Sequence, residues 1–287
     1  MSHNPPTKHQ TFADSRLELA GDILSFSKYG KTFSVGKRPY RKSSKPRNKG
    51  GQSTFRGVTV NRAKKKVIAT VNTNARQWPD ENGKIEPLVF VTLTYDDKLN
   101  GGKVMADVGQ GNKDIRAFLL RLSNRITKDN KQRHYLKYTW VTEFQRRSAV
   151  HYHLAFYNLP FIWWQDLEKL WSHGFIWITA EEDVDIKKHQ SLGHYLAKYM
   201  AKDLADPRLW DFQNYGMSRG LKQPLKLYDT ELADTLTQNL PLKALIKTEK
   251  DVPTSYLGLC DRLTFDLKNY PELKAIIQKI INDQPKP

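Results

Sequence analysis

The sequence has very little cysteine and no long apolar run. Cys260 is its one cysteine, which excludes an intramolecular disulfide and a cysteine-rich zinc site. No apolar run approaches the roughly 18 residues that a membrane-spanning helix needs. Residues 1–6 also lack the basic and apolar regions of a signal peptide. We therefore expect a protein that works in a reducing cytoplasm, in the simplest case a bacterial one, without contact to a membrane.

Acidic residues are scarce relative to basic ones. Lysine and arginine number 47 against 30 aspartates and glutamates, so the formal net charge is +17. Such a charge indicates a polyanionic partner, and nucleic acid is the first candidate ahead of an anionic membrane surface. The Gly-x-x-x-x-Gly-Lys-Ser/Thr phosphate loop is also missing, which excludes an ATP-driven motor in this chain.

Residues 37–66 hold twelve lysines or arginines and no acidic residue. Serine, proline and glycine are interspersed, so we expect much of this stretch to be flexible, because it can bury little apolar surface. A flexible basic arm is a common way to bind nucleic acid, although a merely solubilising segment has the same composition. The candidate DNA-binding residues here are Lys37, Arg38, Arg41, Lys42, Lys64, Lys65 and Lys66, and a later turn adds Arg146 and Arg147.

Apolar periodicity becomes strong after residue 87. Strand patterns and helical patterns alternate in the order βαββαβα, with the strands at 88–95, 135–144, 150–157 and 175–178 and the helices at 115–126, 163–171 and 189–204. This order predicts an α+β fold with a ferredoxin-like (RRM-like) antiparallel sheet and helices packed on one face.

Two segments flank this predicted domain at residues 88–205. Residues 1–87 form the basic N-terminal segment, with a small hairpin turning at Tyr29-Gly30. Residues 206–287 form a largely helical C-terminal extension, with a short strand at 225–228 and a helix that opens at Pro271. We expect this extension to pack against the main domain or to contact a partner.

The strand at residues 150–156 carries His151 and His153 two residues apart, so both imidazoles point to the same face. If the preceding turn centres on Arg147, Glu143 lies opposite His151 across the hairpin, and the aromatic side chains fall on the other face. Two imidazoles and one carboxylate with open coordination positions suit Mg²⁺ or Mn²⁺ acting on a phosphate. The alternatives are a pair of polar residues on a solvated strand and a surface carboxylate that pairs with an arginine of the turn.

The helix near residue 195 carries a second set of candidate residues. Tyr195 and Tyr199 lie one turn apart on one side, as do Lys198 and Lys202. A tyrosine is a poor nucleophile at neutral pH because its pKa is near 10. A divalent cation and a lysine nearby make its attack on a phosphodiester feasible, because both stabilise developing negative charge. Two packed tyrosines with exposed lysines are the alternative.

Together these stretches resemble the motifs of the HUH endonucleases that initiate rolling-circle DNA replication in phages, plasmids and small single-stranded DNA viruses. Residues 90–95 look like the first motif of that family, His151-Tyr152-His153 like its metal motif, and Glu143 falls at its third ligand. Residues 195–202 match its tyrosine–x–x–lysine motif twice.

The resemblance implies a metal-dependent endonuclease and strand transferase that nicks single-stranded origin DNA and leaves a 5′-phosphotyrosine. Tyr199 would be the nucleophile and Tyr195 a second one, while Lys198 or Lys202 would position the metal or neutralise the phosphate. Host helicase and polymerase would be the partners. Two other readings stay open: a transposase or relaxase of the same superfamily, and a non-catalytic nucleic-acid-binding protein.

Overall fold

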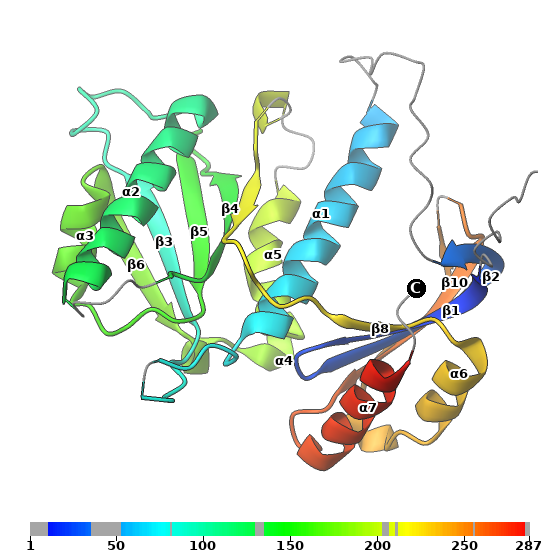
Figure 1. Ribbon diagram of the computed structural model, residues 1–287. Coiled ribbons are helices and arrows are strands. Elements are labelled where there is room, and N and C mark those ends of the chain that lie inside the picture. Colours follow the sequence, from blue (N-terminus) through cyan, green and yellow to red (C-terminus); the bar gives the residue numbers. More distant parts are fainter. Residues whose placement is uncertain are drawn as a thin grey trace, which may run out of the picture. The chain divides into compact units, whose positions relative to one another are not determined.

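The computed structural model describes residues 11–35, 53–80, 82–129, 135–202, 207–209, 212–254 and 256–284. The chain divides into two compact units (Figure 1). The central unit is Gln52–Gln223, and the terminal unit joins Met1–Gly51 to Pro224–Pro287. None of the helices in the described ranges combines the length and the apolarity needed to cross a bilayer.

The central unit is built on an antiparallel sheet with the strand order β6-β3-β5-β4-β7. Its elements follow the chain as α1 (Ser53–Asn74), β3 (Val89–Tyr95), α2 (Val108–Asp129), β4 (Tyr138–Phe144), β5 (Val150–Phe156), α3 (Trp164–Trp171), β6 (Gly174–Ala180), α4 (Ile186–His189), α5 (Leu192–Lys202) and β7 (Tyr215–Met217). The four strands of the βαββαβ unit have the order and directions of a ferredoxin-like sheet, which confirms the predicted fold class.

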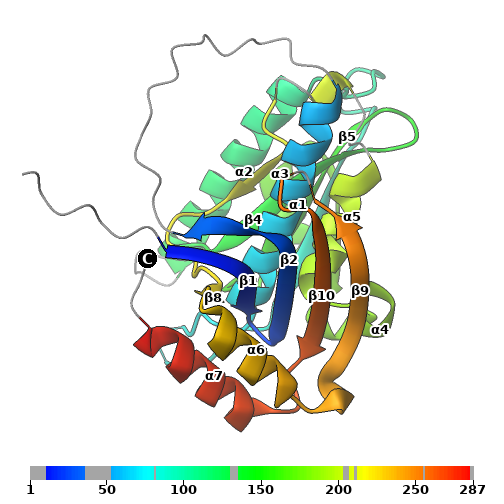
Figure 2. The same cartoon turned by 90° about the vertical axis from the view of Figure 1, so that its right-hand side faces the viewer.

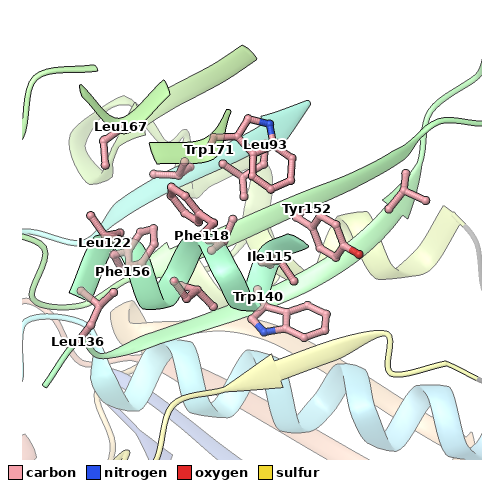
Figure 3. Close-up of a cluster of buried hydrophobic side chains, with 14 of the residues drawn as sticks. Leu93, Ile115, Phe118, Leu122, Leu136, Trp140, Tyr152, Phe156, Leu167 and Trp171 are labelled. Atoms are coloured by element: carbon pink, nitrogen blue, oxygen red, sulfur yellow. The ribbon is translucent and has the colours of Figure 1, made fainter. Parts of the chain in front are cut away.

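One face of this sheet is covered by α2 and α3. The apolar side chains of α2 recur at helical spacing, so they share one side of the helix and pack onto the strands. Figure 3 shows Phe118 and Trp171 meeting Tyr152 and Phe156 in this layer. All four side chains are buried, and they fix the direction in which β5 points its two histidines.

The opposite face carries α1 and α5, which the sequence pattern did not predict. Val67 and Val71 of α1 and Leu196 of α5 pack against Phe90 and Val141 of the sheet. The sheet is therefore covered by helices on both faces, because this second face also presents apolar side chains that need burial. Residues 53–66, expected to be part of a flexible arm, instead form the first half of α1.

The terminal unit brings the two ends of the chain into one sheet, with the order β8-β1-β2-β10-β9. Its elements are β1 (Thr11–Ala20), β2 (Ile23–Val35), β8 (Leu225–Leu227), α6 (Thr230–Gln238), β9 (Leu245–Pro253), β10 (Leu259–Asp266) and α7 (Pro271–Asp283). Figure 2 shows α6 and α7 on one face of this sheet, over a core that includes Leu17, Leu24, Phe265 and Ile277.

Two expectations for the chain ends meet different outcomes. The short strand and the helix opening at Pro271 are present as β8 and α7. The predicted turn at Tyr29-Gly30 was wrong, since β2 runs straight through it and the hairpin turns at Gly21-Asp22. Gly21 has a φ of 64°, a left-handed conformation that glycine adopts without strain. Long-range pairing of β2 with β10 also keeps it continuous.

Candidate active site

The β4–β5 hairpin places three predicted ligands on one face of the central sheet. Glu143 pairs with His151 and Val141 with His153, which is the register that the sequence predicted. Trp140 and Leu154 pair on the other side and enter the core. We call the side with Glu143, His151 and His153 the histidine face.

These three side chains are largely buried, with Glu143 5% exposed and His151 and His153 each 6% exposed. Glu143 is therefore not a surface carboxylate. Its Oε2 lies 2.7 Å from Nε2 of His153, and Nδ1 of the same imidazole lies 3.0 Å from Oγ1 of Thr92 on β3. Both ring nitrogens of His153 are thus positioned by neighbouring strands, which fixes the orientation of the ring.

α5 brings Tyr199 onto this group. Its ring is stacked on that of His153, with 3.5 Å between the ring centroids and 9° between the planes. Tyr195 lies one turn earlier and packs edge-on against Phe90, with 4.7 Å between the centroids. Nζ of Lys198 lies 3.9 Å from the ring centre of Tyr195 and 4.7 Å from that of Tyr199. Of the two tyrosines, Tyr199 is therefore the one that stacks on a predicted metal ligand.

The environment of Tyr199 favours its protonated form. Burial raises the pKa of its phenol above the usual value, and the hydrogen bond with Tyr195 and the negative charge of Glu143 raise it further. The phenol is consequently un-ionised at neutral pH. Acting as a nucleophile would require positive charge beside it, such as that of the nearby Lys198.

α1 holds α5 in this position through a close helix contact that the sequence reasoning missed. Oδ1 of Asn72 accepts a hydrogen bond of 2.8 Å from the backbone N–H of Gly193, in a buried setting. A Cβ atom on Gly193 would collide with the carbonyl oxygen of Ile68 and lie 2.8 Å from its Cα. A glycine near the start of a helix is the only local sign of such a contact.

The donor set of the histidine face fits a divalent cation, because two imidazoles and one carboxylate converge from adjacent strands. As they lie, however, no group of three or more histidine, cysteine, aspartate or glutamate side chains within the described ranges forms a metal site. Nε2 of His153 instead contacts Glu143 directly. The metal site and its ligands remain a prediction.

The remaining predicted residues are spread over several places. Lys64 is partly buried on α1, whereas Lys65 and Lys66 of the same helix and Arg146 of the hairpin turn are exposed. Outside the described part of the chain fall Lys37, Arg38, Arg41, Lys42 and the side chain of Lys202.

Arg147 tethers the hairpin turn to the end of β3. It forms an ion pair with Asp97 and donates hydrogen bonds of 2.7 Å to the carbonyl of Tyr95 and 2.8 Å to Oε1 of Gln145. These contacts give Arg147 a structural task at the end of the sheet, whatever its role toward DNA.

Comparison with known proteins gives one match, and it falls on the part of the chain that carries this site. Residues 88–204, which are less than half of the chain, match the family model of the replication-associated protein ORF2. The matched stretch contains the complete βαββαβ unit and α5. This match is consistent with a replication initiator that interacts with DNA. No curated protein and no solved structure matches the chain.

Proposed function

We propose that the central unit nicks and rejoins single-stranded DNA to initiate rolling-circle replication, as a member of the HUH endonucleases. One observation carries the proposal: Tyr199 stacks on His153, beside Glu143, inside the stretch that matches a replication-associated family. The net charge of +17 supports a DNA substrate.

In the proposed reaction, the phenolic oxygen of Tyr199 attacks the phosphorus of one phosphodiester and gives up its proton. The bond from phosphorus to the 3′-oxygen breaks, and that oxygen takes up a proton to become the hydroxyl that primes synthesis. The 5′ end stays on the protein as a phosphotyrosine. Because one phosphoester replaces another, a later attack by a 3′-hydroxyl can close the strand without ATP.

The neighbouring side chains would support this step electrostatically. Lys198 would counter the charge that develops on the phenolic oxygen and the phosphate, and Lys202 would follow one turn later on the same side of α5. Glu143, His151 and His153 would hold Mg²⁺ or Mn²⁺, which when bound supplies Lewis-acid polarisation of the phosphate. Strand separation and synthesis would come from host helicase and polymerase.

Metal binding gives a test that does not depend on activity. We expect Mn²⁺ affinity, measured by isothermal titration calorimetry, to fall at least about tenfold in Glu143→Ala, because the carboxylate is one of three proposed ligands. His173→Ala is the matched control, since this histidine packs against Tyr95 and Trp171, away from the three ligands. Equal affinity in Glu143→Ala and the unmodified protein would contradict the ligand assignment.

The basic surface of α1 makes DNA binding dependent on salt. We expect log Kd for oligothymidylate to rise linearly with log salt, and each lysine that contacts a phosphate contributes a slope of about 0.7. Replacing Lys65 and Lys66 by glutamine should therefore lower that slope, measured by fluorescence anisotropy over a series of NaCl concentrations. The same double change at Lys243 and Lys250 of the terminal unit is the control. An unchanged slope in the α1 variant would remove these lysines from the interface.

A nicking assay tests the proposed activity itself. Overlapping single-stranded oligonucleotides from the replicon that carries the gene would be incubated with the protein and Mn²⁺. Cleavage together with a covalent protein–DNA adduct on a denaturing gel is the expected result. Neither product on any oligonucleotide would leave a DNA-binding protein without nuclease activity. A nick at an element end or transfer origin would instead identify a transposase or a relaxase.

A further inference from the structure

The histidine face continues beyond the three predicted ligands to the edge of the sheet. Cross-strand pairing sets His153 beside Thr92 of β3, and Thr92 beside Trp177 of β6. In the neighbouring row, His151 lies beside Thr94, which lies beside Phe175. Directly paired residues of antiparallel strands point to the same face. Trp177 and Phe175 therefore project from the same face as the histidines.

Exposure increases along both rows toward β6. His151 and His153 are buried beneath α5, and Thr92 and Thr94 are partly exposed. Phe175 is 57% exposed and Trp177 is 72% exposed. Figure 1 shows β6 at the edge of the sheet, with β3 and β5 between it and β4. The part of the histidine face next to β6 is thus accessible.

The fold leaves these two aromatic rings outside the core. Ile176 lies between them in sequence and points the other way, where it packs against the cluster under α2 and α3. Turning Trp177 inward would require β6 to shift by one residue, which would also expose Ile176. Two large apolar side chains at i and i+2 are consequently displayed about 7 Å apart along an edge strand.

We propose that Trp177 and Phe175 form a stacking platform for the bases of single-stranded DNA next to the bond that is cut. This inference rests on the proposed function and adds where the substrate lies. Aromatic rings bind the faces of successive bases with little regard to sequence. Trp177 is two strands from His153, about 10 Å at the usual spacing of strands. A base on that ring would belong to a nucleotide close to the scissile phosphate.

Charge and continuity favour DNA as the occupant of this surface. The rows that carry the two aromatics run without interruption into the predicted active site. The site is flanked by the ammonium group of Lys198, and the chain carries a net charge of +17, which attracts a polyanion and repels a second copy of the same chain. A strand of DNA can therefore pass from the open edge at β6 toward Tyr199 beneath α5.

Binding measured without cleavage tests the platform. Fluorescence anisotropy with labelled oligothymidylate in EDTA should show Kd rising about tenfold or more in Trp177→Ala, because an aromatic stack is lost. Trp177→Tyr should restore binding to within about twofold, since a tyrosine ring still stacks. Trp163→Ala is the control: this tryptophan is 64% exposed and caps α3, which packs on the other face of the sheet. Its Kd should not change.

The outcomes separate this inference from the proposed function. Weaker binding in Trp177→Ala, combined with no covalent adduct in the unmodified protein, would support the platform while rejecting the nuclease. An adduct in the unmodified protein with an unchanged Kd in Trp177→Ala would overturn the platform alone. Unchanged DNA affinity with an altered oligomeric state in light scattering would overturn it too, and would assign the edge of β6 to a second copy of the chain.

Discussion

Replacing Tyr199 by phenylalanine is expected to remove the covalent protein–DNA adduct and to slow nicking by at least about a thousandfold. The substitution deletes one oxygen atom, the proposed nucleophile, and keeps the ring that stacks on His153. The lost hydrogen bond with Tyr195 should lower the free energy of unfolding by only about 1 kcal/mol. A single-turnover assay with labelled single-stranded DNA measures the adduct, and thermal unfolding verifies the fold.

Tyr195→Phe is the matched variant, because it deletes the same atom one turn away. Tyr195 packs on Phe90 rather than on a predicted ligand, so this variant should retain most of the first cleavage. Loss of the adduct in Tyr199→Phe alone would exclude an obligatory second nucleophile. If Tyr195→Phe loses the adduct and Tyr199→Phe keeps it, the assignment of the nucleophile is wrong. Loss in both variants would indicate that the two tyrosines act as a pair.

Gly193→Ala is expected to reduce both stability and nicking, although it improves a helix. Alanine is favoured over glycine within a helix by up to about 1 kcal/mol. Against this gain, the added methyl group collides with backbone atoms of Ile68, which cannot move as a side-chain end can. Such overpacking costs about 1–3 kcal/mol. The collision should outweigh the propensity gain, and α5 should shift away from α1 together with Tyr199.

Chemical denaturation and the single-turnover assay measure these two effects. Gly30→Ala is the control, because a Cβ atom there would meet Leu259 at an ordinary 3.6 Å and leave stability nearly unchanged. Asn72→Ala removes the hydrogen bond to Gly193 without any collision, so it should also slow nicking, but with a smaller loss of stability. A Gly193→Ala protein of increased stability and full activity would show that the contact between α1 and α5 does not position the tyrosine.

The sequence predicted the central unit well because its signals are local. The apolar run at β3 and the helical spacing in α2 each lie within one element, and both elements are present. The register of Glu143 against His151 followed from a tight turn, since neighbouring strands joined by a short turn have few ways to pair. The same locality explains why the pairing of aromatics on one side and histidines on the other could be foreseen.

The terminal unit could not be foreseen, because its partners are far apart in the chain. Phe26 of β2 pairs with Leu263 of β10, and Leu17 of β1 pairs with Leu227 of β8. Neither β9 nor β10 shows a clean alternation of apolar and polar residues, so the C-terminal extension was predicted to be mainly helical. Only the sheet formed by both ends supplies the burial that makes these segments strands.

By itself, the sequence determined which residues are chemically equipped for strand transfer: Glu143, His151 and His153 on one hairpin, and two tyrosines on one helix. It also determined their order and the face of each element on which they lie, because side-chain direction follows local backbone geometry. The tertiary structure alone decided that Tyr199, rather than Tyr195, stacks on His153. That choice depends on how α5 is packed, and Asn72, which binds Gly193 121 residues later, contributes to it through a contact that no local pattern encodes.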